Sequence, residues 1–179
     1  MSDETPVRHP GAPAPGSLIP SHNEMCFGCG SGGSPGLAMS LRAGPGVSVT
    51  GDVVIADWHQ GAPGLAHGGV LAAIMDELLG SLNWMLMQPS VTARLTTDFV
   101  RPVPVDTTLW LHAEGVKVVG RKFTARGSAH LGGPDGGVAV RAEALFIGVS
   151  REHFLTHGRP QDVQRALDDG AWKPEAGGP

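Results

Sequence analysis

Charge and cysteine are both scarce in this chain of 179 residues. Charged side chains make up only 17% of the residues, and the formal net charge is −4. A nucleic-acid-binding protein normally carries a basic patch or stripe, so we expect no nucleic-acid partner. The two cysteines, Cys26 and Cys29, are fewer than a secreted disulfide scaffold usually contains.

The sequence also has few features of a membrane or secreted protein. No uncharged apolar run approaches the roughly 18 residues that indicate a membrane span. The Pro- and Gly-rich start of the chain lacks the apolar core of a signal peptide. We therefore expect a cytoplasmic protein with reduced thiols and no membrane partner.

Composition divides the chain into three parts. We predict a mostly irregular N-terminal extension over residues 1–33, because its first 20 residues are rich in Pro, Gly and Ala and show no hydrophobic period. This extension is expected to be disordered or loosely draped. Residues 34–150 form the predicted domain, and residues 151–179 a C-terminal extension with a short helix near 161–169 and a Gly/Pro tail.

Two hydrophobic periods alternate within the predicted domain. Alternation of apolar and polar residues, bounded by turn residues, predicts strands at residues 37–42, 47–55, 91–100, 108–119, 122–131 and 138–149. Residues 68–87 repeat apolar side chains at three- and four-residue steps, which predicts a helix apolar around most of its circumference. We therefore predict an α+β domain in which one antiparallel sheet of about six strands curls around a single buried helix.

Three motifs follow one another in a diagnostic order. They are CFGCGSGGSPGLAMSLR from Cys26, AHGGVLAAIMDELLG from Ala66 and TARLTTDFVRPV from Thr92. Together they resemble hotdog-fold acyl-CoA thioesterases of the PaaI-like, or phenylacetate-degradation, type. The resemblance spans roughly residues 24–149. It implies a hotdog domain that hydrolyses acyl-CoA, with Asp76, nine positions after His67, as the catalytic carboxylate.

Thioester hydrolysis requires a donor for the carbonyl oxygen and a group that delivers the attack. The first turn of a helix offers unpaired N–H groups and a partial positive charge. Gly68 and Gly69 lie at that turn and leave room for a substrate to approach. We expect Gly68 to polarise the carbonyl, Gly69 to contact the substrate, and Asp76 to act either as general base or as nucleophile.

The spacing of these groups predicts an obligate homodimer. Asp76 lies eight residues beyond Gly68, which is about 12 Å along a helix axis. Both groups must approach one carbonyl within about 3 to 3.5 Å, so a single helix does not supply both. Two antiparallel helices across a two-fold axis would pair Gly68 of one subunit with Asp76 of the other. The resemblance adds a dimer of dimers, a homotetramer, as a further option.

The resemblance also implies roles for other residues. It gives His67 a structural or substrate-orienting hydrogen bond, Thr92 a hydroxyl that positions water, and Gln60 an amide near the substrate.

The phosphates of the CoA nucleotide require cations. Arg101, Arg121, Lys122 and Arg126 lie on or beside late strands and are candidates for these contacts. The turn with Arg121 and Lys122 is the favoured one, since a turn at a subunit edge can reach phosphates in solvent.

No metal site and no cofactor are predicted, because coenzyme A would be part of the substrate. Cys26-x-x-Cys29 has the spacing of two zinc ligands, but no second pair follows it. His22 and His9 are the nearby candidates for further ligands, at irregular spacing.

Two other functions remain open from the sequence. A non-catalytic acyl-CoA-binding or regulatory protein would keep the same fold without turnover. A hotdog dehydratase would pair a histidine with a carboxylate at a different spacing, which His67 and Asp76 fit poorly.

Overall fold

The computed structural model describes residues 3–30 and 36–168. The expected Gly/Pro tail and residues 31–35 of the motif that begins at Cys26 lie outside the described residues. The elements are β1 (Ser40–Ala43), β2 (Ser48–Val54), the 3-10 turn η1 (Asp57–His59), α1 (Gly68–Gly80), α2 (Asn83–Leu86), β3 (Ser90–Phe99), β4 (Thr108–Val119), β5 (Lys122–Leu131), β6 (Val138–Gly148), α3 (Arg151–His157) and α4 (Pro160–Asp168).

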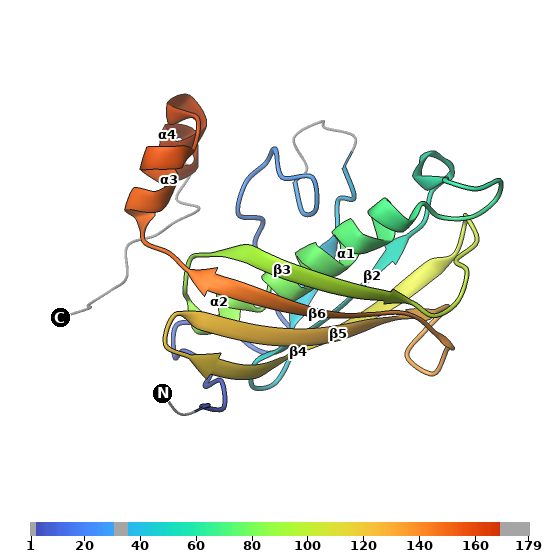
Figure 1. Ribbon diagram of the computed structural model, residues 1–179, viewed down its shortest axis with the longest axis horizontal. Coiled ribbons are helices and arrows are strands. Elements are labelled where there is room, and N and C mark those ends of the chain that lie inside the picture. Colours follow the sequence, from blue (N-terminus) through green and yellow to red (C-terminus); the bar gives the residue numbers. More distant parts are fainter. Residues whose placement is uncertain (1–2, 31–35, 169–179) are drawn as a thin grey trace.

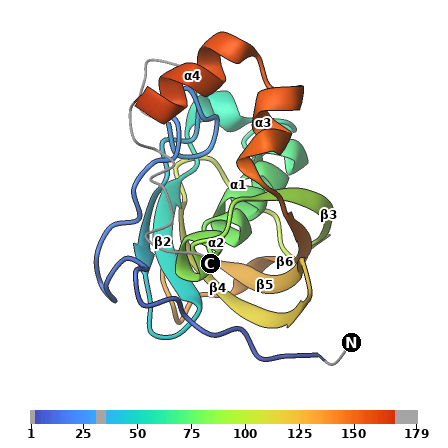
Figure 2. The same ribbon diagram turned by 90° about the vertical axis from the view of Figure 1, so that its left-hand side faces the viewer.

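Six strands form one antiparallel sheet in the order β1-β2-β4-β5-β6-β3. The sheet curves around α1, which lies inside the curve in both views (Figures 1 and 2). Helices α3 and α4 project away from the sheet. The predicted α+β hotdog arrangement is therefore confirmed.

The core lies between α1 and the inner face of the sheet. One face of the helix is fully buried, and its members are Leu71, Ile74, Met75, Leu78 and Leu79. The strands beneath them present small side chains such as Ala113, Ala125 and Ala144. At Gly127 an added Cβ would lie 3.3 Å from the Leu79 side chain, so the bare backbone there lets the helix approach the sheet closely.

The predicted helix over residues 68–87 divides into two. The Ser81 hydroxyl donates to the carbonyl of Leu78 at 2.7 Å, and the Asn83 amide donates to the carbonyl of Gly80 at 3.0 Å. Side chains of this type compete with the backbone ladder for its carbonyls and end or bend helices. A left-handed Met87, with φ of 52°, then ends α2 just before Pro89.

Length and composition alone would let Gly68–Leu86 cross a membrane, with 19 residues and a mean hydropathy of 1.2. Asp76 and Glu77 interrupt this stretch. In the structure the stretch is the core helix of the domain, because its apolar face is covered by the sheet.

The described part of the N-terminal extension is irregular and is bound to the domain. Glu4 and Val118 exchange backbone hydrogen bonds of 3.0 and 2.9 Å, and the N–H of Ile19 donates to the carbonyl of Leu41 at 2.8 Å. The guanidinium of Arg8 donates to the carbonyl of Gly44 at 2.9 Å. Composition did not predict these contacts, because each depends on a partner far along the chain.

Candidate active site at the edge of the sheet

The predicted carboxylate and the predicted hydroxyl meet at the edge of the sheet. Thr92 donates a hydrogen bond from its Oγ1 to Oδ1 of Asp76 at 2.9 Å. Thr92 belongs to β3, which ends the strand order, and its side chain is exposed. Asp76 is half-buried on α1. The carboxylate is thus held by a neutral donor at a place that solvent and a ligand can reach.

A β-bulge sets the direction of the Thr92 side chain. Thr92 pairs with Phe146, whereas Arg94 pairs with the adjacent Leu145, so Ala93 is the extra residue in β3. Phe146 is a buried core residue of the inner face, and Thr92 shares that face with it. Bulges often re-aim a side chain next to an active site. Here the bulge accompanies a hydroxyl that points toward the helix.

The start of α1 has one amide without a partner in the described chain. The side chain of His67 caps the helix, with Nδ1 accepting from the N–H of Gly69 at 2.9 Å. The N–H groups of Val70 and Leu71 donate to the carbonyl of His67 at 3.0 and 3.1 Å. Among these first-turn amides only that of Gly68 has no hydrogen bond within the residues described, and it therefore remains available to an acceptor.

The loop before the helix is fixed by its own hydrogen bonds. His59 is buried, its Nδ1 accepts from the N–H of Ala56 at 3.0 Å, and burial lowers its pKa. Its carbonyl accepts from the N–H of His67 at 2.7 Å. Gln60 bonds within the same loop, with Oε1 accepting from the N–H of Gly64 at 2.6 Å and Nε2 donating to the carbonyl of Asp57 at 3.3 Å.

Gln60 therefore lies near the helix start, where the sequence predicted it, but its amide is bonded to its own loop. Contact with a substrate would require it to exchange one of those bonds. The exposed His67 ring makes the kind of bracing contact that the resemblance implied.

The predicted cations lie at two different ends of the sheet. Arg101 follows β3 and donates to the carbonyl of Val138, where β6 begins. Arg121 and Lys122 lie at the turn between β4 and β5, beside a hollow of about 480 Å³ that they line together with Val119, Gly120 and Ile147. Both side chains are exposed.

Arg126 is engaged elsewhere. Its guanidinium forms an ion pair with Glu114 at 2.7 Å, next to a hollow on the sheet that both residues line. A phosphate contact by Arg126 would require breaking that pair.

Comparison with known proteins identifies the family. The family model described as Thioesterase superfamily matches residues 63–138, the part that holds His67, Gly68, Asp76 and Thr92. A solved thioesterase superfamily protein is 33% identical, with a TM-score of 0.62, over 76% of this chain and 70% of that one. The chain belongs to the thioesterase superfamily.

Two other proteins are similar to this chain over part of its length. An acyl-coenzyme A thioesterase of Bos taurus is 40% identical over 64 residues, which cover 36% of this chain and 26% of that protein. The PaaI protein of E. coli, from the phenylacetic acid degradation operon, shares the fold with a TM-score of 0.59 at 13% identity, over 64% of this chain and 81% of that one. The chain spans less than half the length of the curated relatives that it matches. The resemblance to PaaI-like hotdog thioesterases is confirmed.

Glu77, the residue after Asp76, has no role in the predicted site. No ion pair of Glu77 occurs among the described residues. Its carboxylate instead accepts from the thiol of Cys26 at 3.5 Å, in a group with His22 and Cys29. Sequence reasoning missed this group because Glu77 is distant from the cysteines along the chain, and no local spacing joins them.

Burial and close contact shift the acidity of this group. Burial raises the pKa of Glu77 to about 7. The pKa of Cys26 is lowered, first because the Cys29 thiol donates a hydrogen bond to its sulfur, and also because of His22. The contact with Cys26 in turn raises the pKa of His22.

The His67 cap generates a stability prediction for this thioesterase-superfamily domain. We expect His67→Ala to lower the free energy of unfolding by about 0.5–2 kcal/mol, because the Gly69 N–H loses its acceptor. Asparagine is a strong helix cap, so His67→Asn should retain most of the stability. Urea denaturation of both variants measures the difference. Equal losses for alanine and asparagine would contradict a capping role.

Proposed function

We propose that this chain hydrolyses acyl-CoA thioesters to the free acid and CoA, with Asp76 delivering the attack. The observation that carries the proposal is the 2.9 Å hydrogen bond from Thr92 to Asp76 at an exposed sheet edge. Thr92 occupies one lone pair of one carboxylate oxygen, which leaves the other oxygen to face a substrate or a water molecule. The acyl-coenzyme A thioesterase among the relatives supports the same substrate class.

Two routes use the same groups. As general base, Asp76 takes a proton from water while the water oxygen attacks the carbonyl carbon; the C–S bond then breaks and the CoA sulfur receives the proton. As nucleophile, a carboxylate oxygen forms a mixed anhydride with release of CoA, and water then hydrolyses the anhydride. In both routes the Gly68 N–H stabilises the negative charge that develops on the carbonyl oxygen.

The proposal places each site between two copies of the chain. Gly68 and Asp76 lie eight residues apart in one continuous helix, about 12 Å along its axis. Strand β3 is an edge of the sheet, and Phe99 near its end is 54% exposed. An exposed edge strand is a template for pairing with another chain. A two-fold axis beside β3 would bring the Gly68 end of one helix to the Asp76 region of its partner.

The positions of the cations fit this arrangement. Phe99 lies close to the helix start, since an added Cβ at Gly68 would be 3.5 Å from the Phe99 ring, and Arg101 follows two residues later. Lys122 pairs with Ile147 on β6, and the adjacent Phe146 pairs with Thr92. The Arg121–Lys122 turn therefore lies near the end of the sheet where Thr92 contacts Asp76. We propose that these cations contact the phosphates of CoA.

Thiol release tests the reaction directly. Across a panel of acyl-CoAs, we expect Asp76→Asn to lower kcat by about 10²- to 10⁴-fold, the usual contribution of a general base. Asp52→Asn, which neutralises an exposed carboxylate on β2, should leave kcat unchanged. Asp76→Asn turning over at the parent's rate would overturn the assignment. A parent that binds acyl-CoA without releasing thiol would favour the non-catalytic binding protein.

The threonine hydroxyl generates a second prediction. We expect Thr92→Val to lower kcat by about 10- to 100-fold with little change in KM, because a hydrogen bond to a charged group contributes about 1.5–3 kcal/mol. Thr92→Ser keeps the hydroxyl and should retain most of the rate. Steady-state kinetics on the best acyl-CoA of the panel compare the two. A valine variant as active as the serine variant would exclude a role for this contact.

A further inference from the structure

A second group of reactive side chains lies beside the proposed active site. His22, Cys26 and Cys29 come from residues 21–30, which we call the lead-in segment. Glu77 comes from α1, one residue after Asp76. All four side chains are half-buried. The family model matches residues 63–138 and does not include His22, Cys26 and Cys29, and the proposed hydrolysis uses none of the four side chains.

The geometry of this group is that of a metal-binding site. One ligand atom from each of the four residues lies within 4.8 Å of all the others. The Cys29 sulfur is 3.3 Å from Nδ1 of His22, and the Cys26 sulfur is 3.5 Å from Oε2 of Glu77. A tetrahedral zinc with bonds of about 2.0–2.3 Å separates its ligand atoms by about 3.3–3.8 Å. These two pairs already meet that separation, and small side-chain shifts would bring the remaining pairs, all within 4.8 Å, to it.

The backbone around the cysteines forms a tight turn that positions both sulfurs. The N–H of Gly30 donates to the carbonyl of Cys26 at 2.9 Å. An added Cβ at Gly30 would lie 2.4 Å from that same carbonyl oxygen, and one at Gly28 would lie 2.2 Å from Oε2 of Glu77. Larger residues would therefore clash with the turn or with the carboxylate, and glycine at both positions lets the loop close over Glu77.

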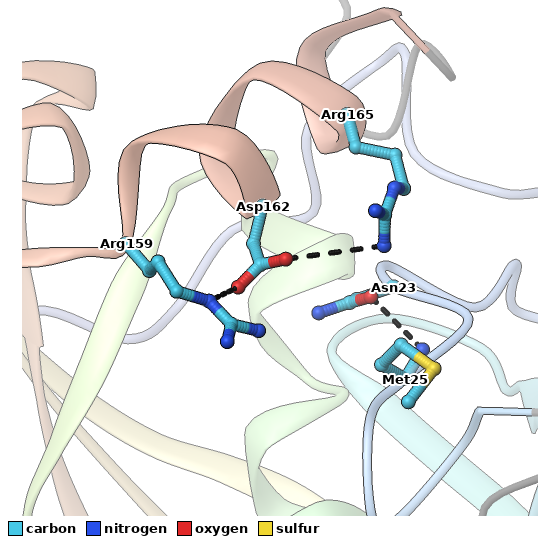
Figure 3. Close-up of polar contacts among 5 residues, drawn as sticks. All are labelled: Asn23, Met25, Arg159, Asp162 and Arg165. Atoms are coloured by element: carbon cyan, nitrogen blue, oxygen red, sulfur yellow. Dashed lines mark hydrogen bonds and ion pairs between the residues drawn. The ribbon is translucent and has the colours of Figure 1, made fainter.

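The charges around the group call for a cation. Glu77 has no Lys or Arg partner among the residues described, and its carboxylate accepts a hydrogen bond from the Cys26 thiol. Figure 3 shows the lead-in turn, where Asn23 accepts from the N–H of Met25 at 2.9 Å, together with α4. Arg159, just before α4, and Arg165 within it are both directed to Asp162. Both guanidinium groups therefore form ion pairs with Asp162 and not with the Glu77 carboxylate.

We propose that His22, Cys26, Cys29 and Glu77 bind one zinc ion, which fastens the lead-in segment to α1 beside Asp76. The donor set is two thiolates, an imidazole and a carboxylate, all of which are ordinary zinc ligands. Cys-x-x-Cys has the usual spacing of a ligand pair, and soft thiolates select zinc over magnesium or calcium. With four protein ligands the coordination is closed, so the ion is structural. The proposal does not depend on the thioesterase reaction.

Metal content and spectroscopy test the site on the full chain. After reconstitution with zinc and removal of excess metal, we expect about one zinc per chain by elemental analysis. Cobalt(II) in place of zinc should give intense tetrahedral ligand-field bands and a thiolate charge-transfer band. Chelation of the metal should lower Tm, because a structural zinc contributes folding free energy.

Matched variants separate the site from adventitious binding. Cys26→Ser should abolish the thiolate band of that sulfur and stoichiometric zinc. Glu77→Gln should weaken zinc binding by more than the about 10- to 100-fold that loss of an outer-shell partner costs. Glu24→Gln, an exposed carboxylate in the same segment, should bind zinc as the parent does.

Three results would overturn the proposal. One is substoichiometric zinc in the reconstituted parent. Another is equal loss of affinity in the Glu24 and Glu77 variants. The third is a disulfide between Cys26 and Cys29 instead of two thiolates. It would be detected by mass spectrometry of protein that is kept in a buffer with the redox potential of a reducing compartment and then alkylated. If Glu77→Gln does not fold, competition of the parent's zinc against a chromophoric chelator still decides between a built site and weak surface binding.

Discussion

The packing of α1 against the inner face of the sheet is the contact on which the rest of this structure depends. Five fully or nearly buried residues of the helix fill the curve of the sheet, and alanines and Gly127 beneath them let the helix approach closely. This contact fixes the rotation of the helix. It therefore also fixes where the two acidic residues point, although neither contributes to the core.

Asp76 and Glu77 are consecutive, and they diverge because successive helix residues lie about 100° apart. Asp76 reaches the hydroxyl of Thr92 at the exposed edge, and Glu77 reaches the thiol of Cys26 in the lead-in segment. One turn of a buried helix thus carries two separate polar sites. The rigidity of α1 also holds the Gly68 amide about 12 Å from Asp76, which is why the proposed reaction needs a second chain.

Local patterns predicted most of the fold. Period-two alternation identified all six strands, and two of them, residues 108–119 and 122–131, match β4 and β5 in both bounds. The helix was predicted from its apolar repeat, but its break at Ser81 was not, because the break depends on side-chain bonds to Leu78 and Gly80. Helix α3 was missed, since its seven residues carry little hydrophobic period.

The candidate site was predicted in part. His67, Gly68 and Asp76 follow from one contiguous motif, and the structure adds the direct contact of Asp76 with Thr92. The bulge at Ala93 and the attachment of the N-terminal segment were not predictable, because both are set by pairing with distant strands. The four-residue group around Glu77 was missed for the same reason. Cys26, Cys29 and His22 were recognisable in the sequence as possible metal ligands, and Glu77 joins them only through the fold.

Subunit mixing tests most directly whether an amide and a carboxylate from different chains act on one thioester. Asp76→Asn chains are co-expressed with Gly68→Pro chains, and the mixed dimer is purified through different affinity tags on the two. Proline is tolerated at the first position of a helix and lacks the N–H that is to hold the carbonyl oxygen. Each variant alone is expected to be nearly inactive, whereas the mixed dimer contains one intact site out of two and should recover about half of the parent's activity. A mixed dimer no more active than either variant alone would contradict the account.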